Sequence, residues 1–132
     1  MKAALVAFGV LLSLGAQAET PTPACQNERQ CEAMWSAAQV AIGVATGMSN
    51  RLVEGDRIET HPATSDSRLT GVVTKVPAGQ EGYRIIVDLS CYRATQCDDL
   101  ARSGAELFNT LVIDAGASLG PLPEATTIDR QA

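Results

Sequence analysis

The sequence is poor in histidine and aromatic residues, and it lacks the nucleotide-binding and zinc motifs of several common enzyme families. It has one histidine, His61, one tryptophan, two tyrosines and two phenylalanines among 132 residues. The glycine-rich loops GxGxxG and GxxxxGK[ST] and the HExxH zinc motif do not occur in it. A serine triad would have to use His61, which we expect at the end of a strand. We therefore assign no catalytic residue and no cofactor.

The sequence also lacks an apolar run long enough to cross a membrane, which takes about 20 residues. Its main apolar run, Ala3 to Leu14, follows the positively charged Lys2 and precedes Ala16-Gln17-Ala18. This pattern is typical of a secretory signal peptide with small residues before the cleavage site. We predict a signal peptide over residues 1–18 and a periplasmic or secreted mature chain. The alternative, a membrane anchor, needs a longer run.

Basic residues are outnumbered by acidic ones. The mature chain from Glu19 keeps fifteen acidic residues and nine of the ten basic ones, because Lys2 leaves with the signal, so its formal charge is −6. Binding to nucleic acid or to an anionic membrane requires clustered Lys and Arg. The charge argues against both kinds of partner.

Four cysteines, Cys25, Cys31, Cys91 and Cys97, lie in the predicted mature chain and form no CxxC motif. An even number in a short exported chain indicates disulfides, and the five-residue gaps are wide for a zinc site. We expect local bridges, Cys25–Cys31 and Cys91–Cys97, although four cysteines permit three connectivities. A redox-active pair is the alternative, because thiols at helix starts have a lowered pKa. Catalytic dithiols, however, are usually spaced as CxxC.

Hydrophobic periodicity predicts two helices and three strands. The first helix spans residues 28–46, with Asn27 and Gly47 as its caps, and the second begins near Gln96 after Thr95 and ends at Gly116. Alternating residues predict strands at 51–61, 68–76 and 83–91. We expect a flexible lead-in at 19–24, a single domain at 25–115 and a disordered tail at 116–132.

The order α-β-β-β-α predicts an α+β fold. Short connections between neighbouring strands favour a three-stranded antiparallel meander. Each helix has one apolar stripe, so we expect both to pack on one face of the sheet, with the disulfides fastening the chain to the helix starts.

The opposite face of this sheet is the main candidate for binding. Two rows of alternating residues are expected to point away from the helices: Arg57, Glu59 and His61 in one, and Arg84, Ile86 and Asp88 in the other. Such a face is commonly solvated, and the functional interpretation is a docking surface for a protein or an envelope component. Val72, Val73 and Val76 leave the orientation of the middle strand open, which allows a second copy of the chain, as a homodimer, to cover the face.

One longer pattern resembles a known group. Cys25-x5-Cys31-x2-Met34-Trp35-x-Ala37-Ala38 is followed by Thr46-Gly47-Met48, Arg57-Ile58-Glu59-Thr60, Cys91-x5-Cys97 and Leu107-Phe108-Asn109. Over about residues 25–112 this resembles small exported proteins of proteobacteria that have no established activity. The resemblance implies export and cysteines paired within the domain, and it implies no catalytic residue.

Two hypotheses of function follow. The first is a non-enzymatic interaction module that binds a protein or envelope component through its sheet face. The second is a small extracytoplasmic hydrolase or thiol-redox enzyme, which a carboxylate-lined cleft or reactive thiols would favour. The single histidine and the absence of nucleotide-binding and zinc motifs favour the first.

Overall fold

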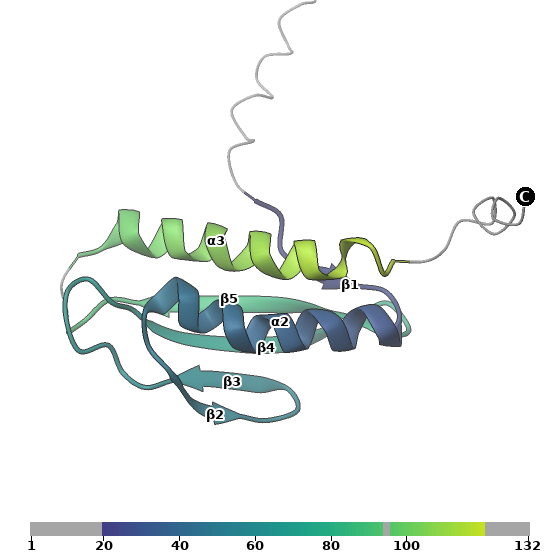
Figure 1. The fold of residues 1–132 in the computed structure, drawn as a ribbon, viewed down its shortest axis with the longest axis horizontal. Helices are drawn as coiled ribbons and strands as arrows, with labels where there is room; N and C mark the ends of the chain where they lie inside the picture. The colour runs from purple at the N-terminus through teal and green to yellow at the C-terminus, as the bar shows by residue number, and fades with distance from the viewer. Residues whose placement is uncertain (1–19, 94–95, 121–132) are drawn as a thin grey trace, which may run out of the picture.

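Two helices and five strands make up the fold (Figure 1). The structure is a computed structural model and describes residues 20–93 and 96–120. In chain order the elements are β1 (Ala24–Cys25), α2 (Glu28–Thr46), β2 (Asn50–Val53), β3 (Arg57–Thr60), β4 (Thr70–Ala78), β5 (Gly82–Ser90) and α3 (Asp98–Ala117). The predicted α+β class is confirmed. The predicted signal peptide, Thr95 and residues 121–132 of the predicted tail lie outside the described residues.

All five strands form one antiparallel sheet in the order β1-β5-β4-β3-β2. The expected count of three strands was wrong for two reasons. The segment predicted as one strand at 51–61 folds back on itself as the hairpin β2–β3, where the Glu54 N–H donates to the Arg57 carbonyl at 2.8 Å. The polar residues Glu54-Gly55-Asp56 favour this turn.

The lead-in contributes the fifth strand. Ala24 and Cys25 pair with Arg84 and Tyr83 of β5, and the Ile85 N–H donates to the Pro23 carbonyl at 3.0 Å. Pro23 and Cys25 are buried. The last residues of the segment predicted to be flexible at 19–24, Pro23 and Ala24, thus lie at the sheet edge, next to the disulfide-bonded Cys25.

Helix α2 has the predicted bounds and caps. The Asn27 side chain accepts a hydrogen bond from the Gln30 N–H at 2.8 Å, and Gln30 Oε1 accepts one from the Gln26 N–H at 2.7 Å. At the other end Gly47 adopts the left-handed conformation, φ 78°, and its N–H donates to the Gly43 carbonyl at 2.8 Å. These bonds satisfy backbone groups that a helix end leaves unpaired.

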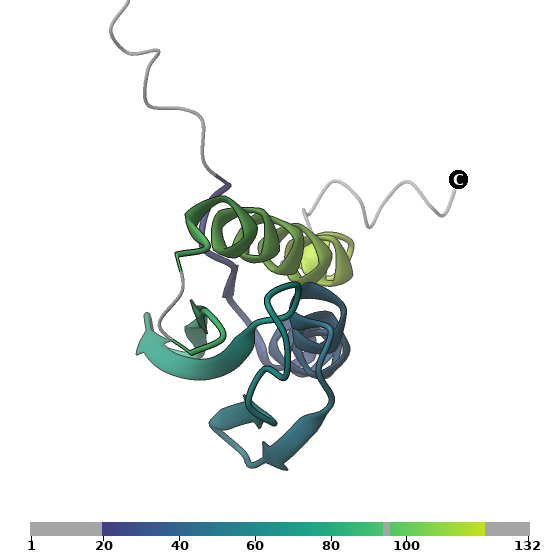
Figure 2. The ribbon, with the colours of Figure 1, turned by 90° about the vertical axis from the view of Figure 1, so that its left-hand side faces the viewer.

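Both helices cover the same face of the sheet (Figures 1 and 2). The core between the layers includes Met34, Trp35, Ala38, Ala41 and Ile42 from α2, Ile58, Val73 and Ile85 from the strands, and Phe108 and Val112 from α3. Gly71 of β4 allows α2 to lie close, because a Cβ there would meet Ile42 Cδ1 at 2.7 Å. Among the described residues, this core lies between the helices and one face of the sheet, and no helix covers the other face.

Helix α3 differs from expectation at its end. It continues through Ala117, two residues beyond the predicted domain end at 115, and Gly116 lies inside it. A Cβ on Gly116 would meet the Met34 side chain at 2.3 Å. The glycine thus permits close packing of the two helices, and it does not stop the helix as predicted.

Candidate functional site

The strand register determines which side chains face away from the helices. Directly paired residues share a face of an antiparallel sheet. Ile58, Val73 and Val87 are paired and lie on the helix side, where the first two are fully buried. The alternate residues form what we call the open sheet face: Arg57, Glu59, Thr70, Val72, Thr74, Val76, Arg84, Ile86, Asp88 and Ser90.

The open sheet face contains five of the six predicted binding residues, namely Arg57, Glu59, Arg84, Ile86 and Asp88. The sixth, His61, lies one residue past the end of β3, is exposed, and donates its backbone N–H to the Ser49 carbonyl at 2.9 Å. The structure also resolves the ambiguity of the middle strand. Val73 is buried, whereas Val72 and Val76 lie on the open sheet face.

A β-branched centre runs across the open sheet face. Thr74 is paired with Ile86, and Val72 and Val76 lie two residues to either side of Thr74 on β4. Val76 is an exposed apolar residue, with 38% of its surface accessible. Sequence reasoning missed these β4 residues because a run of Val and Thr has no clear alternation. Gly71, which has no side chain and so leaves room for α2 on the helix side of β4, was the available indicator of orientation.

An ion-pair cluster borders this centre on the β2–β3 side. Glu59 accepts from Arg57 Nε at 2.6 Å and also pairs with Arg51. The hydrogen bond from Arg57 lowers the pKa of Glu59 below its ordinary value of 4.5, and the charges of Arg57 and Arg51 act in the same direction against partial desolvation. The cluster holds three long side chains in a defined arrangement at one border of the open sheet face.

The four cysteines form the two expected local bridges, Cys25–Cys31 and Cys91–Cys97. The first pair is buried in the core, with 3% and 5% of the residue surfaces exposed, and it joins β1 to the first turn of α2. The second pair is half-buried and joins the end of β5 to the residue that precedes α3. The bridges therefore fasten the two helix starts to the sheet, as the spacing predicted.

A cavity of about 430 Å³ opens beside the first bridge. It is lined by Glu28, Cys31, Glu32, Lys75, Glu81 and Tyr83. The Tyr83 hydroxyl donates to the Cys31 carbonyl at 3.0 Å, and burial, followed by the charge of Glu32, raises the pKa of Tyr83. The cavity is carboxylate-lined, which the hydrolase hypothesis requires.

The glutamates of this cavity do not resemble a general acid–base pair. Glu28, Glu32 and Glu81 are all exposed. A carboxyl group that acts as a general acid near neutral pH usually has its pKa raised by a desolvated site. The exposed positions of these three glutamates do not provide such a site.

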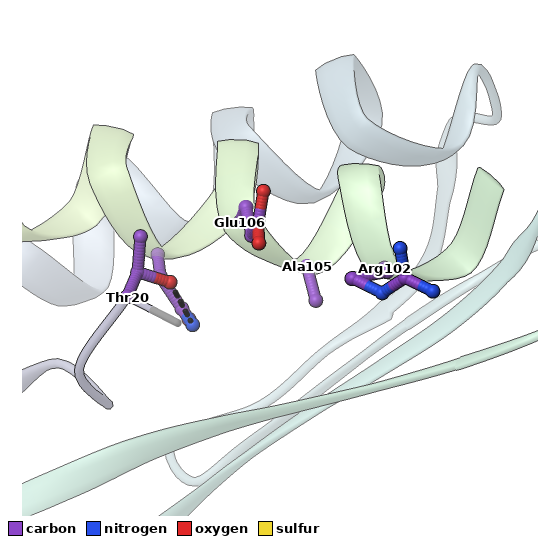
Figure 3. A pocket seen from close by; sticks show the side chains of 5 residues that line it. Thr20, Arg102, Ala105 and Glu106 are labelled. Carbon is purple, nitrogen blue, oxygen red and sulfur yellow. Dashed lines mark hydrogen bonds between the residues drawn. The ribbon is translucent and has the colours of Figure 1, made fainter. Parts of the chain in front are cut away.

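A second, smaller hollow of about 190 Å³ lies between the lead-in and α3. Figure 3 shows Thr20 facing a row of α3 side chains that includes Arg102, Ala105 and Glu106. Asn109, on the same helix, donates to Thr20 Oγ1 at 3.3 Å. The hydrogen bond attaches the lead-in to α3, which is a structural role.

No family model, no curated protein and no solved structure matches this chain. The resemblance to small exported proteins therefore stays a prediction. Within residues 20–93 and 96–120, no group of three or more His, Cys, Asp or Glu side chains is placed to hold a metal ion. In the same residues no helix is both long and apolar enough to span a bilayer.

Proposed function

We propose that this chain is an exported, non-enzymatic interaction module that binds another protein through its open sheet face. One observation carries the proposal: both helices cover one face of the sheet, and the other face presents the β-branched centre, in which three of the four side chains are apolar, within a border of charges. Protein interfaces commonly combine a compact apolar centre with a polar rim. The two bridges and the predicted signal peptide support an extracytoplasmic location, where disulfides persist.

Charge distribution suggests the chemistry of the partner. The open sheet face with Arg51 has three basic and two acidic residues, whereas the rest of the described chain has five basic and ten acidic ones. The face is thus the weakly basic side of an acidic protein. A partner that brings acidic side chains around an apolar patch would be complementary to it.

Site-specific photo-cross-linking in cells that make the protein tests the proposal. A photoreactive residue at Thr74 is expected to cross-link to a distinct protein, and one at the exposed Ser36 of α2 is expected not to do so. The substitution Ile86→Glu should reduce the Thr74 cross-link about tenfold or more, because it replaces an apolar side chain of the β-branched centre by a carboxylate that repels the acidic side chains proposed for the partner.

Val44→Glu provides the matched control. Val44 is 57% exposed on α2, so this variant introduces the same charge on the helix side. It should leave the cross-link unchanged, and circular dichroism should show that both variants are folded. Cross-linking from Ser36 alone, loss of the cross-link in Val44→Glu, or cross-linking only to a second copy of the chain would each contradict the proposal.

A further inference from the structure

Four exposed aliphatic side chains form a patch on the helix layer. Val40 and Val44 of α2 are 69% and 57% exposed, and Leu107 and Leu111 of α3 are 42% and 36% exposed. Each pair is spaced by four residues, so its two members are neighbours on one side of their helix. Single exposed apolar residues are common on proteins, whereas a contiguous group of them marks an interaction surface. We call these four residues the helix patch.

The two valines of the helix patch point away from the sheet. The residues two positions after them, Ile42 and Thr46, lie against Gly71 of β4, where a Cβ would meet their side chains at 2.7 and 2.9 Å. Two residues correspond to about 200° around an α-helix, so Val40 and Val44 lie on the opposite side of α2. The helix patch is therefore separate from the open sheet face, which lies beyond the sheet.

The two leucines of the helix patch lie beside the valines, where the helices meet. A Cβ on Gly104 of α3 would lie 3.2 Å from the carbonyl oxygen of Ala45, near the end of α2, and Gly116 contacts the start of α2. The helices thus run antiparallel (Figures 1 and 2). Leu107 and Leu111 lie within about 60° of Gly104 around α3, on the side of α2 and level with the two valines.

The helix patch is too small to hold a second copy of the chain by itself. A valine or leucine side chain has about 100 Å² of apolar surface to bury. The four members are exposed over about half of their surface on average, so together they offer roughly 200 Å². A stable interface between two proteins buries about 800 Å² on each partner. A segment of the same chain needs less area, because its tether gives it a high effective concentration.

The chain itself leads to the helix patch. The last residue described at the end of α3, Gly120, sits beside the start of α2, because a Cβ there would lie 3.5 Å from Gln30 Nε2. The same Nε2 donates to the Gly116 carbonyl at 2.9 Å and holds the end of α3 against α2. Residues 121–132 therefore start where the two helices meet, at the end of α2 away from Val44.

The length and sequence of residues 121–132 match the distance to the helix patch. Fourteen residues separate Gln30 from Val44, which gives a rise of about 21 Å along α2 and an offset of only about 40° around it. The eight residues from Gly120 to Ile128 span up to about 26 Å when extended. Leu122 and Ile128 are the two large apolar residues of this segment. Ile128 can thus reach Val44 while Leu122 stays near the start of α2.

We propose that residues 121–132 run back along the line where α2 and α3 meet, with Ile128 covering the helix patch. The contact removes apolar surface of both the segment and the patch from water, which favours it. The partner of this surface is thus a segment of the same chain. This contact is independent of the open sheet face and goes beyond the proposed function.

Photo-cross-linking within the full mature chain tests the contact. A photoreactive residue at Ile128 is expected to cross-link to α2 or α3 beside the helix patch. In a mixture of isotope-labelled and unlabelled chains, both ends of each cross-link should come from one molecule. Val44→Glu should reduce the yield about fivefold or more, because the covering segment would bury an unpaired charge.

Val53→Glu is the matched control for this experiment. Val53 is 48% exposed on the edge strand β2, so the variant adds the same charge at a similarly exposed valine outside the helix patch. It should leave the yield unchanged, and circular dichroism should show that both variants are folded.

Binding of the dye anilinonaphthalene sulfonate provides a second measurement on the full mature chain. Ile128→Glu should raise the dye fluorescence about twofold or more, because the helix patch then stays exposed to a dye that binds apolar surface. Gln131→Glu adds the same charge to the segment without removing an apolar side chain, and it should leave the fluorescence unchanged.

Four outcomes would overturn the proposal. They are cross-links between labelled and unlabelled chains, cross-links only outside α2 and α3, equal losses of yield in Val44→Glu and Val53→Glu, and unchanged dye fluorescence in Ile128→Glu. The first of these would assign the helix patch to a second copy of the chain. None of them alters the cross-link expected from Thr74 on the open sheet face, so this proposal and the proposed function can fail separately.

Discussion

Removal of the two disulfides, one at a time, separates two contributions to the free energy of unfolding: the lower entropy of a cross-linked unfolded chain and the packing of the sulfur atoms in the folded one. The variants are Cys25→Ala with Cys31→Ala, and Cys91→Ala with Cys97→Ala. Both bridges span a sequence separation of six residues, so they constrain the unfolded chain equally. They differ in the folded state, because the first is part of the core and the second is half-buried.

The magnitudes follow from this difference. Closing a loop of this size contributes about 2 kcal/mol to the free energy of unfolding, for either bridge. Loss of two buried sulfur atoms from the core adds about 1 kcal/mol each for the first bridge. We therefore expect a loss of about 4 kcal/mol for the first double variant and about 2 kcal/mol for the second. A domain with a stability of roughly 5 to 15 kcal/mol can survive the second loss.

Urea unfolding followed by far-ultraviolet circular dichroism measures both losses. The first double variant should unfold at the lower urea concentration, and its β1 amides should exchange faster, because β1 is held by two residue pairs and by the bridge. The reasoning is refuted if the two variants lose the same stability, or if removal of Cys91–Cys97 is the more damaging change. Mass spectrometry of the parent protein must first show two intact bridges.

Three further predictions concern the sheet edge and two titrating groups. Gly82→Ala should destabilise the fold by roughly 2 kcal/mol or more, because the alanine Cβ would lie 1.9 Å from the Cys25 carbonyl oxygen and displace β1. Unchanged hydrogen-exchange protection of the Ile85 amide in this variant would contradict this account. Burial and the charge of Glu32 raise the pKa of Tyr83, so the free energy of unfolding should fall as pH rises above the ordinary value of 10.0. An ultraviolet absorbance titration in which Tyr83 ionises at that ordinary value would disprove this prediction. The lowered pKa of Glu59 stabilises the fold above its ordinary value of 4.5, and this contribution is lost as pH falls through the lowered pKa. Glu59→Gln should thus be less stable than the parent near neutral pH, and a difference that persists in strong acid would count against the ion-pair cluster.

Much of the fold could be predicted from local patterns. Helix α2 has the bounds expected from the spacing of Cys31, Met34, Trp35 and Ala38, and its caps Asn27 and Gly47 act within a few residues of chain. The alternation of β5 and the local pairing of the cysteines were equally readable. These features depend on backbone periodicity and on contacts between near neighbours, which a linear pattern records.

The predictions from sequence were wrong where contacts between residues far apart in the chain outweigh the local conformational preference of a residue. The end of the lead-in pairs with β5, about sixty residues further along the chain, and this pairing places Ala24, the last residue of the predicted flexible segment, in a strand with Cys25. Gly116 is typical of a helix end, yet it lies inside α3 because Met34 packs against it. Neither contact leaves a periodic pattern in the sequence.

The candidate sites divide in the same way. Alternation of polar and apolar residues along each strand determined that Arg57, Glu59, Arg84, Ile86 and Asp88 share a face. Only the folded chain decided that Val72 and Val76 join them, and only the packing of α2 against the end of β4 brought Lys75 onto Trp35 beside three glutamates. The physical reason is that strand alternation is set by the backbone of each residue, whereas a cavity is formed by side chains that meet across long stretches of chain.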